Sequence, residues 1–126
     1  MSNASGGPFV RLDHLQIAIP ADGEGRARTF YVDIIGLEEV PKPEVLKKRG
    51  GVWLKSGEVR VHLGIDKEFA PATKAHPAFR CTDFDGLLKR FASRSVAVVH
   101  ADEPFEGKRH CYVLDPFGNR IELIEN

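Results

Sequence analysis

Three histidines and one glutamate with the chemistry of metal ligands are spread along this 126-residue chain: His14, His62, His76 and Glu122. Each lies in a segment where apolar and polar residues alternate, which is the pattern of a β-strand. Three imidazoles and a carboxylate suit Fe(II), Mn(II), Ni(II), Co(II) or Zn(II). No two of the four are close in sequence, and a single histidine is more often a structural residue. A metal site is therefore predicted only if the strands bring the four side chains together.

The positions of these residues repeat along the chain. His14 and His76 are 62 residues apart, and His62 and Glu122 are 60 apart. The expected order of a strand, a helix and three strands also occurs twice, which indicates an internal duplication. We therefore expect one α+β domain over residues 10–126, with module one at 10–65, a linker at 66–75 and module two at 76–126. Residues 1–9 are expected to be a disordered N-terminal segment or residues added for expression.

The elements of the two modules follow from hydrophobic periodicity and turn residues. A helix is expected over 24–35, and a second over 83–94 with Thr82 or Asp83 as its N-cap. The segment Asp115-Pro-Phe-Gly-Asn119 has the composition of a tight turn. Strands are expected at 10–19, 37–40, 51–55, 58–65, 76–81, 96–100, 108–114 and 119–125.

Alternation sends apolar residues to the face under the helices and an unusual polar set to the opposite face. That polar set is His14, Gln16, Arg60, His62, His76, Arg80, Arg120 and Glu122. If the two sheets curl toward each other, this face lines a cleft. Its guanidinium groups favour an anionic substrate, because they bind carboxylate and phosphate through paired hydrogen bonds. The alternative for at least one of them is pairing with a structural acid or with solvent.

Three further side chains are weaker candidates for the site. Tyr112 either donates a proton or hydrogen bond to a substrate or only packs. His110, on the same face as Tyr112, and His100, beside a turn, are less favoured as metal ligands.

Composition excludes several kinds of partner. The 18 basic and 18 acidic residues cancel, so no basic excess points to nucleic acid or to a membrane surface. The longest purely apolar run has four residues, Val96 to Val99, which is too short for a membrane span. Cys81 and Cys111 form neither a zinc pair nor a disulfide framework, which fits reduced thiols and a cytoplasmic location.

Several segments resemble the vicinal oxygen chelate superfamily, which includes glyoxalase I, bleomycin resistance proteins, fosfomycin resistance proteins and extradiol dioxygenases. These segments are 13–19, 30–37, 76–79 and 114–122, and the most specific is the ending Asp-Pro-x-Gly-(x)2-Ile/Leu-Glu that finishes at Glu122. The resemblance implies two paired βαβββ modules in an incomplete curved barrel around a divalent metal, usually in a homodimer. It implies ligands at His14, His76 and Glu122, and it places His62 where glyoxalase I has a fourth-strand glutamate.

The resemblance also implies a reaction class. The metal would act as a Lewis acid on a small anionic substrate chelated through vicinal oxygens, in a lyase, isomerase, transferase or dioxygenase, with Glu122 and Tyr112 as candidate catalytic residues. Ala18 and Asp66 replace two glutathione-contacting residues of glyoxalase I, whereas Tyr112 matches a tyrosine of the fosfomycin resistance branch. The alternatives are a metal-free ligand-sequestering protein of the bleomycin resistance type, and a metal-binding sensor or partner subunit.

Overall fold

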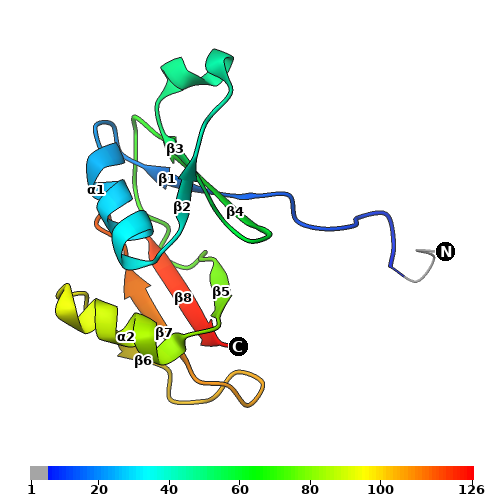
Figure 1. The fold of residues 1–126 in the computed structure, drawn as a ribbon, viewed down its shortest axis with the longest axis vertical. Helices are drawn as coiled ribbons and strands as arrows, with labels where there is room; N and C mark the ends of the chain where they lie inside the picture. Colours follow the sequence, from blue (N-terminus) through cyan, green and yellow to red (C-terminus); the bar gives the residue numbers. More distant parts are fainter. Residues whose placement is uncertain (1–5) are drawn as a thin grey trace.

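Two four-stranded sheets with the same strand order form the framework of the protein (Figure 1). The computed structural model describes residues 6–126. The first sheet has the order β1-β4-β3-β2 and the second β5-β8-β7-β6, and in each sheet the first-named pair is parallel and the other two are antiparallel. The strands are β1 (Leu15–Ile19), β2 (Glu38–Val40), β3 (Val52–Ser56), β4 (Val59–Ile65), β5 (Ala78–Cys81), β6 (Val99–His100), β7 (His110–Leu114) and β8 (Arg120–Glu125). The predicted fold class, an α+β arrangement of paired modules in an incomplete barrel, is confirmed.

Both expected helices are present, and the first changes its hydrogen bonding midway. Helix α1 (Glu24–Arg28) continues into η1 (Thr29–Ile34), a π-helix in which the amide of Ile35 donates to the carbonyl oxygen of Phe30 at 2.9 Å. Helix α2 (Phe84–Ser93) begins after Asp83, whose carboxylate accepts from the amide of Gly86 at 3.1 Å. The charged segment between β2 and β3 contains a short 3₁₀ helix, η2 (Glu44–Arg49).

Apolar residues from both sheets and both helices form one core on the helix side of the sheets. Figure 1 shows α1 and α2 on the same side of the strands. The largest fully buried side chains are Tyr31, Phe91, Ile19, Leu54, Leu63, Ile121, Leu123, Val52, Val61, Val113 and Cys111. Because successive residues of a strand point to opposite faces, burying these residues leaves their neighbours on the open face.

The turn from Asp115 to Asn119 joins the second sheet to the first. The carboxylate of Asp115 accepts hydrogen bonds from the amides of Phe117 (2.9 Å) and Asn119 (2.8 Å), from the Asn119 side chain (2.9 Å) and from the Tyr31 hydroxyl (2.7 Å). The Asn119 side chain also donates to the carbonyl oxygen of Ala18 at 2.9 Å. The predicted turn therefore positions the start of β8 beside the end of β1.

Some strands are shorter than expected. The ladder of β1 with β4 begins at Leu15, so residues 10–14 are not part of a strand. Strand β5 starts at Ala78, because the preceding Pro77 has no amide hydrogen to extend the ladder. Strand β6 is reduced to Val99–His100.

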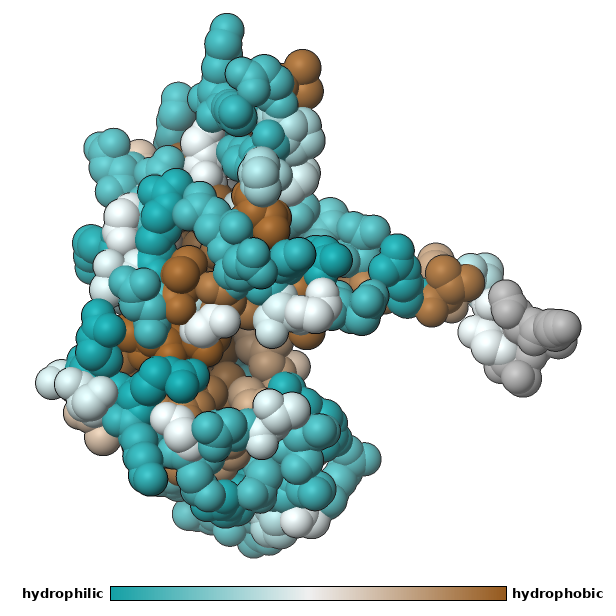
Figure 2. All heavy atoms as spheres, viewed as in Figure 1, coloured by the Kyte–Doolittle hydropathy of each residue, from teal (hydrophilic) through white to brown (hydrophobic). Residues whose placement is uncertain are grey.

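Residues 6–14 form an exposed arm that leads away from the body (Figures 1 and 2). The disorder expected for residues 1–9 falls in part on residues 1–5, which lie outside the described residues.

Candidate functional site

The strand register places the polar side chains on the face opposite the core. In the first sheet His62 lies between Gln16 of β1 and Trp53 of β3, and Arg60 lies opposite Lys55. In the second sheet Glu122 lies between Ala78 of β5 and Tyr112 of β7. The side chains expected to line a cleft therefore form two groups, one on each sheet.

The first group is built around the imidazole of His62. Its ring is stacked between Trp53 and His14, with 4.1 Å between ring centroids in each case. Nδ1 of His14 lies 2.9 Å from Oδ1 of Asp13. Burial and the neighbouring His14 lower the pKa of His62 below its usual value of 6.5. His62 is therefore neutral at pH 7, which is the protonation state that a metal ligand requires.

The second group surrounds the carboxylate of Glu122, which is only 7% exposed. Nε2 of His76 lies 3.0 Å from its Oε1, and Nδ1 of His110 lies 2.8 Å from its Oε2. The other ring nitrogen of His76 faces the carbonyl oxygen of Lys74 at 2.9 Å. A carbonyl oxygen only accepts, so Nδ1 of His76 donates to Lys74, and Nε2 faces Glu122.

Other predicted residues surround this carboxylate. The ring of Tyr112 meets His76 and His110 edge-on, with centroid distances of 5.7 and 5.8 Å, and the guanidinium of Arg120 lies over Tyr112 at 4.2 Å. Arg80 instead forms an ion pair with Glu106 at 2.7 Å. Arg80 therefore makes the structural pairing that was its alternative role.

The structure brings the four predicted ligands together as two pairs, His14 with His62 and His76 with Glu122. Within residues 6–126, no three His, Cys, Asp or Glu side chains form a group that could hold a metal ion. His110, which the sequence ranked low, contacts Glu122 directly. The sequence indicated this contact only through the position of His110 two residues before Tyr112, on the same face of the expected strand. His100 is exposed on β6.

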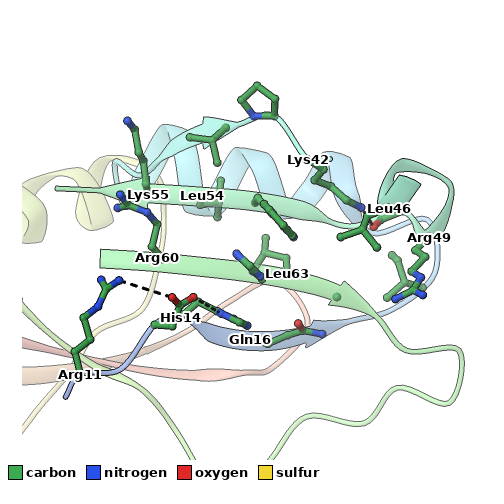
Figure 3. A pocket seen from close by; sticks show the side chains of 18 residues that line it. Arg11, His14, Gln16, Lys42, Leu46, Arg49, Leu54, Lys55, Arg60 and Leu63 are labelled. Carbon is green, nitrogen blue, oxygen red and sulfur yellow. Dashed lines mark hydrogen bonds and ion pairs between the residues drawn. The ribbon is translucent and has the colours of Figure 1, made fainter. Parts of the chain in front are cut away.

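A cavity of about 910 Å³ lies on the open face of the first sheet (Figure 3). His14, Gln16, Trp53 and His62 contribute to its lining. Its basic side chains are Arg11, Lys42, Arg49, Lys55 and Arg60, and its one acidic side chain is Asp13. The electrostatic character of this half of the open face is therefore strongly positive.

The comparisons with known proteins agree with this architecture. No curated protein matches the chain. It superposes on the crystal structure of a protein from Bacillus anthracis assigned to the glyoxalase family, with a TM-score of 0.88 and 43% identity over 94% of this chain and 98% of the other. The crystal structure of a lactoylglutathione lyase from Agrobacterium tumefaciens superposes with a TM-score of 0.67 and 26% identity, over 95% of this chain and 96% of the other.

A more distant structure shares the fold alone. The fosfomycin resistance protein FosX from Listeria monocytogenes gives a TM-score of 0.74 and 15% identity over 94% of this chain and 95% of the other. Residues 11–123 match the model of one protein family. The chain belongs to the Glyoxalase/Bleomycin resistance protein/Dioxygenase superfamily.

Proposed function

We propose that this protein is a metal-dependent enzyme that acts on a small anionic substrate chelated through vicinal oxygens. The observation that carries the proposal is the spacing of His76 and Glu122. Two adjacent ligands of one divalent ion would lie about 3 Å apart. Nε2 of His76 and Oε1 of Glu122 are 3.0 Å apart. The pair therefore has the ligand types and the spacing of two adjacent positions around a divalent ion.

The remaining ligands of the proposed site are His14 and His62. Both rings lie on the open face of the first sheet, and His62 is in the neutral form. A four-ligand site requires the open faces of the two sheets to approach each other, either within one chain or across a dimer. The bound metal, which would be Fe, Mn, Ni, Co or Zn, would supply a Lewis acid for negative charge on the substrate.

The chain's own residues supply the other functions of the proposed site. The buried carboxylate of Glu122 is the candidate base, and His110 holds its second oxygen. Tyr112 lies opposite Glu122 in the ladder, with Arg120 over its ring. Its hydroxyl is the candidate donor to the substrate. Gln16 and Arg60, in the basic cavity, would bind its anionic group, as would Arg120 on the second sheet.

The test is metal content and affinity, measured by elemental analysis and calorimetry at pH 7. We expect the wild-type protein to bind one first-row divalent ion per chain, and Glu122→Ala to lose it. His62→Ala separates a four-ligand from a three-ligand site, and His100→Ala is the matched control because His100 is exposed and outside both groups. Failure of the wild-type protein to bind any of the five ions would overturn the proposal.

The alternative function is sequestration of a ligand without a metal, as in bleomycin resistance proteins. Two observations favour it. His14 and His62 lie in a different group from His76 and Glu122. The cavity of the first sheet is also large enough for a small molecule without closure. The same metal measurement separates the two functions, because a sequestering protein requires no metal for binding.

We also propose that the protein is a homodimer. Large apolar side chains are exposed both on the N-terminal arm (Phe9, Val10 and Leu12) and on the second sheet (Val99 and Leu114). Figure 2 shows apolar residues of the arm far from the body of the molecule. A second chain would remove these side chains from water. Sedimentation velocity should give the mass of two chains, and a single 14.0 kDa species at micromolar concentration would contradict the proposal.

A further inference from the structure

We infer that the cavity of the first sheet binds an elongated organic molecule that carries an anionic group at each end and an apolar body between them. The inference rests on the proposed function, because it names the substrate class for part of the same open face. It goes beyond that function in specifying the number and the separation of the anionic groups. Three features of the cavity support it: its unpaired positive charge, the distribution of that charge, and its apolar centre.

The basic side chains of the cavity are nearly free of carboxylate partners. Among the described residues, the one ion pair that any of them makes with a carboxylate is Arg11 with Asp13, at 4.0 Å. Lys42 and Arg60 donate to backbone carbonyl oxygens, of Gly50 and Gly57 respectively. These groups therefore keep their full charge for a ligand.

Three arginines elsewhere on the molecule are paired with carboxylates, whereas Arg26 and Arg90 donate to backbone carbonyl oxygens. Arg28 binds Glu39 at 2.9 Å, Arg80 binds Glu106 at 2.7 Å, and Arg109 binds both Asp85 and Glu125. The chain as a whole has no net charge, with 18 basic and 18 acidic residues. A cavity with five basic groups and one acidic group is thus a local concentration of positive charge, which attracts and retains anions.

The charges lie at two ends of the cavity. Lys55 and Arg60 are directly opposite each other in the ladder of β3 with β4, with Arg11 nearby at the same end, whereas Lys42 and Arg49 lie at the far end (Figure 3). Along β4 this separation corresponds to the four residue steps from Arg60 to Gly64, or roughly 13 Å of backbone. A single small anion such as phosphate cannot contact both ends. A molecule with an anionic group at each end can.

The centre of the cavity is aromatic and apolar. Trp53 is stacked on His62 with 5° between the ring planes, and Val40 and Leu46 also contribute to the lining. The amide of Gln16 lies over the backbone at Gly64, where a Cβ atom would come within 2.3 Å of its nitrogen. The middle of the ligand would therefore contact ring edges and aliphatic groups, with one amide available for a hydrogen bond.

The test uses two probes that share an apolar body and differ by one charge: biphenyl-4,4′-dicarboxylate and biphenyl-4-carboxylate. Binding is measured by calorimetry on full-length protein from which metal has been removed by a chelator and gel filtration. Trp53 is the one tryptophan of the chain, so a change in its fluorescence locates the probe in this cavity. We expect the dianion to bind on the order of tenfold more tightly than the monoanion, because a hydrogen bond to a charged group contributes at least that factor.

Single variants at the two ends test the geometry. Lys55→Gln and Arg49→Gln should each remove most of the preference for the dianion, whereas Lys89→Gln, on the exposed side of α2, should preserve it. Circular dichroism confirms that each variant is folded. Equal affinity for the two probes, absence of binding, or a preference that survives both end variants would overturn the inference.

Glu122→Ala separates this inference from the proposed function. Loss of metal binding in that variant, with the preference for the dianion unchanged, supports both proposals. A wild-type protein that prefers the dianion and binds no metal overturns the metal-dependent function alone. One that binds a metal and shows no preference overturns the inference alone.

Discussion

His110 holds the second oxygen of Glu122: its Nδ1 lies 2.8 Å from Oε2, while its Nε2 lies 2.8 Å from the carbonyl oxygen of Glu103. The carbonyl oxygen of Glu103 only accepts, so Nε2 donates to it, and Nδ1 faces the carboxylate. His110 therefore connects the loop after β6 to the central carboxylate of the second sheet. We assign it a positioning role, because it fixes the orientation of Glu122 while the other carboxylate oxygen faces His76.

His110→Ala should weaken metal binding by about 10- to 100-fold, because residues that orient a ligating carboxylate typically contribute this much to affinity. The measurement is calorimetric titration with the divalent ion that the wild-type protein binds most tightly. His100→Ala is the matched control, and it should bind as the wild-type protein does. Unchanged affinity in His110→Ala would show that Glu122 needs no support from this ring.

Asp115→Ala should lower the free energy of unfolding by about 4 kcal/mol, because it leaves several buried donors without their acceptor. The carboxylate is 5% exposed and accepts four hydrogen bonds. The control is Asp83→Ala, which removes one exposed N-cap bond and should cost about 1 kcal/mol. Urea denaturation measures both, and equal losses would contradict the structural role of the turn.

Tyr31→Phe should reduce the loss of stability at alkaline pH. Burial and the nearby charge of Asp115 raise the pKa of Tyr31 well above its usual value of 10. Above that pH the unfolded chain ionises and the folded chain does not, so wild-type stability falls as pH rises, by up to about 1.4 kcal/mol per pH unit from this residue.

The variant lacks this ionisation, and at neutral pH it should be less stable by about 1–2 kcal/mol, because the hydroxyl donates to Asp115. Urea denaturation from pH 7 to 11 provides the comparison. The cysteines are common to both proteins, so their ionisation cancels in the difference. Parallel stability curves above pH 10 would rule out the raised pKa of Tyr31.

Gly51→Ala should destabilise the protein by about 3 kcal/mol, through backbone strain and a steric clash. Gly51 has a φ of +88°, and a Cβ atom there would lie 2.3 Å from the carbonyl oxygen of Leu63. Gly57 also has a positive φ, +56°, but nothing lies within 4 Å of its added Cβ. Gly57→Ala should therefore cost only about 1 kcal/mol. Thermal unfolding distinguishes the two, and similar midpoints would contradict the close approach of β3 and β4 at this position.

The local pattern of apolar, polar and turn-forming residues predicted most of the secondary structure. Alternation identified the faces of β4 and β8, because a side chain's direction in a strand depends only on its position in the pleat. The ends of strands were less predictable, since they depend on partners. His14 and His76 precede β1 and β5 because the ladders begin at Leu15 and Ala78. The π-helical half of the first helix was also missed, because hydrophobic periodicity alone does not separate it from an α-helix.

The sequence by itself determined the fold class and the residue types on the open face, because both follow from periodicity and from the repeated order of elements. Only the tertiary structure decided which side chains meet. The pairing of β7 with β8 brings His110 to Glu122, and the spread of strands over two sheets separates His14 and His62 from His76 and Glu122. The concentration of Lys42, Arg49, Lys55 and Arg60 around one cavity likewise arises from register and loop placement. These contacts join residues distant in the chain, and no local pattern encodes the curvature that brings them together.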